Sequence, residues 1–314
     1  MADSVFGRLN PKNGDCDNLE VIDINNFKAT RPTILCFSGN AATSIHEMIG
    51  FCEMTKDLIG LKESEKEDEI FEYADVLGVA YAHAELGDVG SILSHEIKAI
   101  VDNLFLPLCV KKGEGSIEET CKNLSRFSFF TFCHGSIEVM KICDMLNNKL
   151  INDYGYSPED TDAIFASMMH VSYSPNAVGS FTPMVYAVSG KDRMNGTEVW
   201  GFSFNNKNIA TKLIEPNNKT RTYFPKLAIY VQKLSSDRNN EHGVSIVRRD
   251  NNWKIECDGQ GADVVSQMLG CALSFAVING MKNFNSDNYI PHMNLFEMQQ
   301  ELNNLIENEK NMLD

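Results

Sequence analysis

One short stretch of the chain, Thr131-Phe132-Cys133-His134-Gly135, combines residue types that can carry out covalent chemistry. The residues before it, Phe127 to Phe132, form an apolar and aromatic run typical of a buried β-strand, and the residues after it, Ser136 to Leu150, have helical spacing. A strand that turns sharply into a helix with a reactive side chain at the corner is a nucleophile elbow. The pattern small-x-nucleophile-x-small therefore predicts Cys133 as the nucleophile of a hydrolase or an acyltransferase.

A cysteine at this corner suits acyl transfer, because a thiol attacks as the thiolate and the positive end of the following helix lowers its pKa. The alternative nucleophile is Ser136. It would need His134 and Glu138 at the small positions of the elbow, and both side chains are too large for the tight turn. We therefore expect Ser136 to be the N-cap of the helix, while the bland alternative for Cys133 is a buried structural cysteine.

Strands and helices alternate along most of the chain, and these elements must position the corner. Strand-like runs are expected at 32–37, 75–81, 128–132, 169–173 and 183–188, and helical segments at 42–59, 94–106, 136–150 and from 158 onward. This alternation predicts an α/β fold with a mostly parallel central sheet and helices on both faces.

The region near 197–257 differs from the rest because its short strands are separated by Asn- and Lys-rich turns. Strands are expected at 199–204 and 226–232, and 243–248 with 253–257 is expected to form a hairpin, followed by a long apolar helix at 262–278. We predict one domain at 31–290, preceded by an N-terminal arm or edge hairpin at 1–30 and followed by a helical tail at 291–314.

Composition excludes several classes of function. The chain has 314 residues and a formal charge of −15, which opposes binding to nucleic acid or to an anionic membrane. We expect no membrane span and no signal peptide, because no run of about 18 apolar residues and no basic and apolar leader pattern is found. The nine cysteines include no Cys-x-x-Cys pair, so we expect a reducing, cytoplasmic compartment, no metal and no cofactor. An effector secreted without a signal peptide is the alternative, because the tail 297–314 is rich in glutamate.

The order of elements from Pro32 to Ile278 resembles the α/β-hydrolase superfamily, in its cysteine-nucleophile form, similar to dienelactone hydrolase-like enzymes. The resemblance implies the chain order nucleophile, acid, histidine. Cys133 would be the nucleophile. Asp192 would be the acid, because it follows the strand 184–188 in a Gly-x-Asp turn, and His242 would be the base that follows the strand 227–231.

The resemblance also implies an oxyanion hole made of two main-chain N–H groups. One would belong to His134, directly after the nucleophile, and the other to Asn40 in the loop Ser38-Gly39-Asn40-Ala41. Gly39, His46 and His83 would line the mouth of the pocket, because ligands bind at the carboxyl edge of such sheets.

Four features depart from the family pattern: Thr131 replaces the usual glycine, the strand before the elbow is unusually aromatic, the nucleophile is not serine, and a hairpin lies between His242 and the last helix. His292 is the alternative base, and His170 is expected to be a hydrogen-bonded core residue. Asp192 could be an ordinary turn residue, and His242 could be solvated and inert.

The predicted reaction is acyl transfer from an ester, thioester, lactone or peptide. The alternative is a binding module without turnover on the same scaffold.

Overall fold

A single large sheet forms the centre of the protein. The computed structural model describes residues 3–9, 19–39, 45–60, 74–81, 92–177, 179, 181–189, 209–217, 223–231, 244–249, 252–257 and 262–313. Nine of its strands form one sheet in the order β2-β1-β4-β3-β5-β6-β7-β9-β8. The predicted α/β class, with a mostly parallel sheet, is confirmed.

The central strands are parallel. They are β4 (Asp75–Ala80), β3 (Thr33–Phe37), β5 (Phe127–Phe132), β6 (Met169–Tyr173), β7 (Met184–Ser189) and β9 (Lys226–Val231). Strands β3, β4 and β6 are buried along their whole length. This explains their continuous apolar sequences, since a parallel strand covered by helices has no solvent face. Because the strands are parallel, their carboxyl ends lie together at one edge of the sheet.

The N-terminal residues are part of the sheet and not a separate arm. Strand β1 (Val5–Leu9) pairs antiparallel with β4 and with β2 (Leu19–Ile22), which is the last strand at that edge. The sequence pattern at 1–30 allows an arm or an edge hairpin, and the structure pairs β1 and β2 antiparallel at the edge of the sheet. Its pairing with β4 joins residues about seventy positions apart, a long-range contact that local sequence does not encode.

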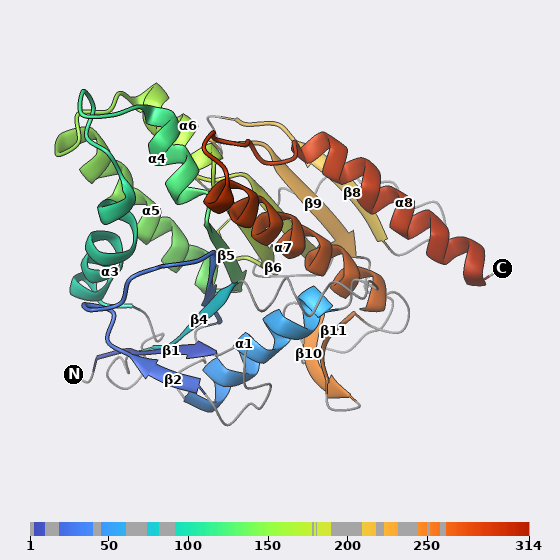
Figure 1. The fold of residues 1–314 in the computed structure, drawn as a ribbon. Helices are drawn as coiled ribbons and strands as arrows, with labels where there is room; N and C mark the ends of the chain where they lie inside the picture. The colour runs from blue at the N-terminus through green and yellow to red at the C-terminus, as the bar shows by residue number, and fades with distance from the viewer. Residues whose placement is uncertain are drawn as a thin grey trace.

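Helices cover both faces of the sheet (Figure 1). On one face lie α1 (Ile45–Gly60), α7 (Ala262–Asn285) and α8 (Leu295–Leu313), which share a hydrophobic core with β3, β6 and β7. On the other face lie α3 (Ser94–Ile100), a π-helical turn (Val101–Phe105), a 3₁₀ turn (Leu106–Leu108), α5 (Gly135–Asn152) and α6 (Pro158–Ala166). Helix α4 (Ile117–Leu124) packs against α6.

The β-rich region after 197 contributes to the sheet and also forms a separate hairpin. Strand β8 (Ile209–Ile214) pairs antiparallel with β9 and closes one edge, where α8 contacts it. The predicted hairpin is confirmed as β10 (Val244–Arg249) and β11 (Asn252–Cys257), and β11 contacts both α1 and α7. The strand expected at 199–204 lies outside the described residues.

Helix α7 is the most apolar helix among the described residues. Its segment Val264–Asn285 is long and apolar enough to cross a membrane, but 78% of its most apolar window is buried inside the protein. Figure 1 shows α7 lying across the central strands, which is the place of a core helix. The absence of a membrane span therefore stays a prediction.

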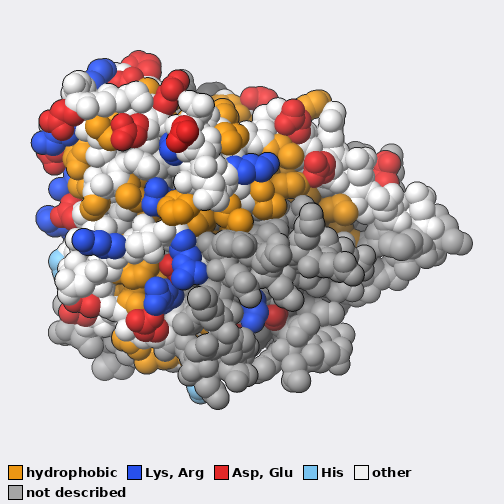
Figure 2. Space-filling model, viewed as in Figure 1, with side chains coloured by type: hydrophobic (Ala, Val, Ile, Leu, Met, Phe, Trp, Pro, Cys, Tyr) orange, Lys and Arg blue, Asp and Glu red, His pale blue; other side chains and the backbone are white. Residues whose placement is uncertain are grey.

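On the face of the molecule that Figure 2 shows, acidic and basic side chains of the described residues are interspersed.

Candidate active site

The corner between β5 and α5 is a turn from a strand into a helix with a strained backbone. Cys133 lies between the two elements with a φ angle of 48°, in the left-handed region that L-residues other than Asn and Asp rarely adopt. Its side chain is buried, with the residue 6% exposed. A strained residue at a reactive position persists only where the surrounding structure holds it, and such strain is concentrated at functional sites.

The glycine two residues after Cys133 is required by a close approach of two backbones. A Cβ atom added to Gly135 would overlap the carbonyl oxygen of Phe37 and would lie 2.9 Å from the carbonyl oxygen of Ser38. Helix α5 therefore begins directly against the end of β3, as the second small position of an elbow demands. No side chain other than hydrogen fits at this position.

The hydroxyl of Ser136 ties the elbow to the loop after β6. It donates to the carbonyl oxygen of Cys133 at 2.8 Å and accepts from the main-chain N–H of Ala177 at 2.9 Å. The same Cys133 carbonyl accepts from the main-chain N–H of Asn176 at 3.0 Å. The Ser136 hydroxyl therefore has two main-chain partners, and Ser136 is not the expected N-cap, because the N-cap of α5 is His134 and has no side-chain cap.

The first position of the elbow, Thr131, is accommodated by a buried hydrogen-bond chain. Its hydroxyl is 2.7 Å from His170 Nε2 and donates to Ser172 Oγ at 2.7 Å. The Ser172 hydroxyl donates in turn to the carbonyl oxygen of Thr131 at 3.2 Å. Since Thr131 already donates its proton to Ser172, it must accept from Nε2–H of His170, which fixes the tautomer of this histidine.

His170 is a core residue, as the sequence predicts. It is 1% exposed, and burial, with a smaller contribution from Lys226, lowers its pKa to about 3. An imidazole in this state stays neutral at every physiological pH. It supports the strand under the elbow and takes no part in proton transfer at Cys133.

The imidazole of His134 lies beside a carboxylate on the first turns of α5. Its Nε2 lies 2.9 Å from Oε1 of Glu138, which also accepts from Nζ of Lys141 at 2.9 Å. The Glu138 side chain is fully buried. Its second oxygen, Oε2, has no hydrogen-bond partner among the described residues, which is a costly state for a buried carboxylate.

The loop after β3 runs beside the elbow. Gly39 is buried, and a Cβ atom added to it would lie 3.6 Å from the Cβ atom of Cys133 and 3.3 Å from the ring of Phe132. The preceding carbonyl, that of Ser38, accepts a hydrogen bond from the hydroxyl of Tyr81 at 2.6 Å. The main-chain N–H of His134 has no acceptor among the described residues, so it is available to an oxyanion.

The end of β6 forms the other wall of the corner. The ring of Tyr173 stacks on Phe132 with centroids 4.3 Å apart, and Ser174 has a φ angle of 43°. Three buried atoms here lack a hydrogen-bond partner in the described part of the chain: Tyr173 OH, Ser174 Oγ and Asn176 Oδ1. Burial, with a smaller contribution from Cys133, raises the pKa of Tyr173 well above its usual range.

The structure brings together three of the predicted site residues, Cys133, His134 and Gly39. His46 is exposed in the first turn of α1, and no hydrogen bond or ion pair within the described ranges joins it to Cys133. The predicted acid Asp192, base His242, oxyanion donor Asn40 and pocket residue His83 lie outside the described residues and stay predictions.

The alternative base, His292, is ruled out by its position. Its Nε2–H donates to the carbonyl oxygen of Ser167 at 2.6 Å, and burial lowers its pKa to about 4. Ser167 precedes β6, whereas Cys133 follows Phe132, which pairs with the last residue of β6. The length of the strand puts roughly 15 Å between them, far beyond proton-transfer distance.

Three other thiols of the described residues, Cys109, Cys121 and Cys143, have environments that suppress reactivity. Burial raises the pKa of Cys109 to about 12 and that of Cys121 to about 12. Cys143 is fully buried on α5, and burial raises its pKa as well. Buried neutral thiols of this kind behave as small apolar groups.

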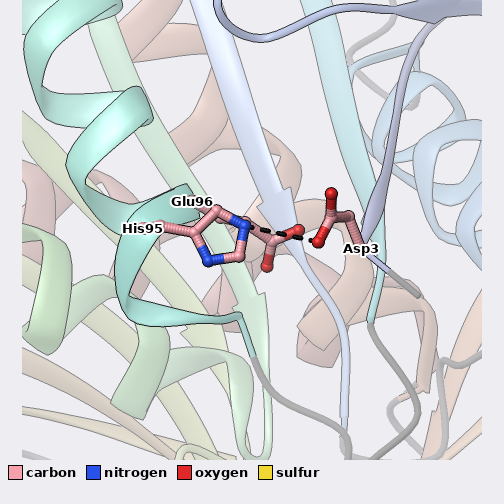
Figure 3. A group of neighbouring side chains, drawn as sticks. All are labelled: Asp3, His95 and Glu96. Carbon is pink, nitrogen blue, oxygen red and sulfur yellow. Dashed lines mark ion pairs between the residues drawn. The ribbon is translucent and has the colours of Figure 1, made fainter. Parts of the chain in front are cut away.

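A second group of possible metal ligands, Asp3, His95 and Glu96, lies where the N-terminal segment meets α3 (Figure 3). The two oxygens of Glu96 already accept from Ser4 N at 2.5 Å, Ser4 Oγ at 2.9 Å and Leu93 N at 2.7 Å. Its carboxylate therefore caps α3 and fastens the N-terminal segment. Asp3 and His95 are both exposed, and Oδ1 of Asp3 lies 3.3 Å from Nε2 of His95, as in an ordinary surface pair.

Four residues of the corner escaped the sequence prediction: Tyr81, Glu138, Ser174 and Asn176. Only Glu138 carried a local signal, because it lies four residues after His134 on a helix, the spacing of a side-chain pair. The others lie just after β4 and β6 and join the corner only when the sheet forms.

Comparison with known proteins gives no further assignment: no protein-family model and no curated protein sequence matches this chain.

Proposed function

We propose that the protein is a cysteine-dependent hydrolase or acyltransferase in which Cys133 is the nucleophile. The observation that carries the proposal is the left-handed backbone of Cys133, at a φ angle of 48°, between a central parallel strand and a helix. A residue with a side chain in this conformation is strained by about 1–2 kcal/mol. A purely structural role would not require this strain, because glycine at position 133 or a relaxed turn would avoid it.

The reaction begins when the thiolate sulfur of Cys133 adds to the carbonyl carbon of an ester, thioester, lactone or amide. The carbonyl π-electrons move to oxygen and form a tetrahedral oxyanion. When the carbonyl re-forms, the leaving group departs with its bonding electrons and takes a proton, and an acyl-thioester on Cys133 remains. Water then releases an acid, or an alcohol, amine or thiol accepts the acyl group.

Features of the corner support the charges that this reaction needs. Helix α5 starts two residues after Cys133, and the partial positive charge of its N-terminal end favours the thiolate. The free N–H of His134 would donate to the oxyanion, and Asn40, in the loop after β3, would supply the second donor.

We further propose His242 as the base and Asp192 as the acid that orients it. In α/β-hydrolases the nucleophile, acid and histidine follow one another in this order, and the second oxyanion donor comes from the loop after strand β3. Cys133, Asp192 and His242 follow one another in that order in the sequence, and Asn40 comes shortly after a strand that is β3 here too. An α/β-hydrolase fold is therefore the finer assignment that we favour.

The test is acylation of the purified protein by p-nitrophenyl acetate, followed by intact mass and peptide mapping. We expect one acetyl group, of about 42 Da, on Cys133, and no adduct on Cys133→Ala. The matched control is Cys109→Ala, because the Cys109 thiol donates to the carbonyl of Phe105 and its pKa of about 12 leaves no thiolate at neutral pH. Equal labelling of the Cys133→Ala variant would contradict the assignment.

The same experiment separates the proposal from the alternative of a binding module without turnover. If iodoacetamide alkylates Cys133 but the ester neither modifies it nor releases p-nitrophenolate faster with Cys133 than with Cys133→Ala, the thiol is accessible and the corner does not support acyl transfer. If the ester acylates Cys133, His242→Asn should slow acylation by about a hundredfold or more, since general-base catalysis contributes about 10²–10⁴. If the ester does not acylate Cys133, this variant gives no information.

A further inference from the structure

Tyr81 joins the end of β4 to the loop that runs beside Cys133. It is 2% exposed, it directly follows β4, and its hydroxyl donates to the carbonyl oxygen of Ser38 at 2.6 Å. Ser38 is the first residue after β3. The phenol therefore holds the loop at the point where it leaves the sheet.

The same backbone segment also lies close to α5. A Cβ atom on Gly135 would overlap the Phe37 carbonyl and lie 2.9 Å from the Ser38 carbonyl oxygen. The Phe37–Ser38 backbone is thus packed against the first residue of α5 and also accepts the hydrogen bond from Tyr81.

The orientation of the next N–H follows from the geometry of the peptide bond. In a planar trans peptide the C=O and the N–H point in opposite directions. Because the Ser38 carbonyl points to Tyr81, the N–H of Gly39 points away from Tyr81. Gly39 itself lies against the elbow, where an added Cβ atom would be 3.6 Å from the Cβ atom of Cys133.

We propose that Tyr81 is a positioning residue that orients the Ser38–Gly39 peptide so that the N–H of Gly39 donates to the oxyanion formed at Cys133. This inference rests on the proposed acyl-transfer function. It places a donor at Gly39, one residue before the Asn40 favoured by the sequence pattern.

The state of the phenol suits this task. Burial is the main cause that raises the pKa of Tyr81 well above its usual range, and the nearby Glu138 and Cys133 add to the effect. The hydroxyl therefore keeps its proton and remains a hydrogen-bond donor while negative charge develops at the sulfur and at the substrate oxygen.

Two reagents distinguish an oxyanion effect from a general effect on the thiol. Acylation by p-nitrophenyl acetate passes through a tetrahedral oxyanion. In alkylation by iodoacetamide the sulfur instead displaces iodide from a CH₂ carbon, and no charge forms on the carbonyl oxygen. We expect Tyr81→Phe to slow acylation of Cys133 by about ten- to a hundredfold, since a misplaced donor costs up to about 10², while alkylation keeps its rate.

A matched control exists at Tyr154, just beyond the C-terminal end of α5. The hydroxyl of Tyr154 also donates to a main-chain carbonyl, that of Leu106, at 3.0 Å. Tyr154→Phe removes the same kind of bond and should leave both rates unchanged. A variant with p-aminophenylalanine at position 81 keeps a hydrogen-bond donor at the same place, and we expect it to be acylated at nearly the rate of the unmodified protein. This variant tests the proposal even if Tyr81→Phe does not fold.

The outcomes are distinguishable. If the unmodified protein is alkylated but never acylated, the proposed function and this inference both fail. If it is acylated and Tyr81→Phe is acylated at the same rate, or if Tyr81→Phe slows both reactions equally, only the positioning role of Tyr81 is overturned.

Discussion

The two ends of helix α5 are built on different principles. At its C-terminal end the chain turns through Gly155, whose φ angle is 77°, and the next helix starts at Ser157-Pro158. Ser157 Oγ accepts from the N–H of Asp160, whose carboxylate accepts from the N–H of Ser157. At its N-terminal end a cysteine takes the left-handed conformation and His134 provides no side-chain cap.

The difference shows where local preference has been overridden. The C-terminal turn uses glycine for positive φ, proline in the first turn and a capping box, so each residue favours the structure that it adopts. The N-terminal turn has a strained cysteine and a buried carboxylate oxygen without a described partner. Conflicts of this kind are expected at functional sites, where structure elsewhere compensates for them.

The largest loss of stability is expected from alanine at Gly135, at the N-terminal end of α5. Gly135→Ala forces a methyl group into the carbonyl of Phe37, so the backbone of α5 or β3 must move. We expect the free energy of unfolding to fall by about 3 kcal/mol, measured by urea denaturation.

Gly155→Ala is the matched control, since its φ angle is also positive but the nearest atom to an added Cβ is 3.9 Å away. Its cost should be only the backbone strain, about 1 kcal/mol. Equal losses for the two variants would mean that close approach does not distinguish the two ends.

The second effect is a pH dependence of the stability that comes from His170 on β6, next to β5. His170 has a pKa of about 3 in the folded protein and about 6.5 in an unfolded chain. Below pH 6.5 the unfolded state therefore binds the proton and the folded state does not, so stability falls as the pH is lowered. The contribution of His170 should be a loss of about 2 kcal/mol between pH 6.5 and pH 5.

His170→Gln can still donate to Thr131 but cannot take up a proton. Urea denaturation at several pH values should therefore show a shallower loss of stability for this variant. The same slope in both proteins would show that the histidine titrates alike in the folded and unfolded states.

The smallest effect is a comparison of two variants at Cys133. Glycine adopts positive φ freely, whereas alanine retains the strain of the cysteine. Cys133→Gly should be more stable than Cys133→Ala by about 1 kcal/mol, and neither variant should be acylated by the ester. If the alanine variant is the more stable one, the left-handed conformation at this corner carries no cost.

Elements with strong local patterns could be predicted from the sequence. The aromatic run before Cys133 is β5, the helical spacing after it is α5, and the strands expected on either side of Asp250-Asn251-Asn252 are β10 and β11. In each case a single period of apolar residues and a clear turn signal agree. The corner itself could be predicted because both of its elements are of this kind.

The surroundings of Cys133 depend on contacts between distant segments and could not be predicted. Tyr81 is 52 residues before Cys133 in the sequence, yet its hydroxyl and the elbow confine the same loop. The left-handed Ser174 follows an ordinary strand and has no glycine or asparagine signal. Ser136 has the residue type of a cap but bonds to another strand's loop, because tertiary contacts decide which partner it finds.

The edge strand β2 has a consequence for the behaviour of the protein in concentrated solution. An open sheet edge offers unpaired N–H and C=O groups to a strand from another molecule, and such pairing leads to aggregation. The opposite edge, β8, is accompanied by α8. Strand β2 is only four residues long, and Glu20 on it pairs with Arg8 on β1 beside the exposed Val21. Short length and this charged pair make β2 a poor template, so they help to keep individual molecules apart.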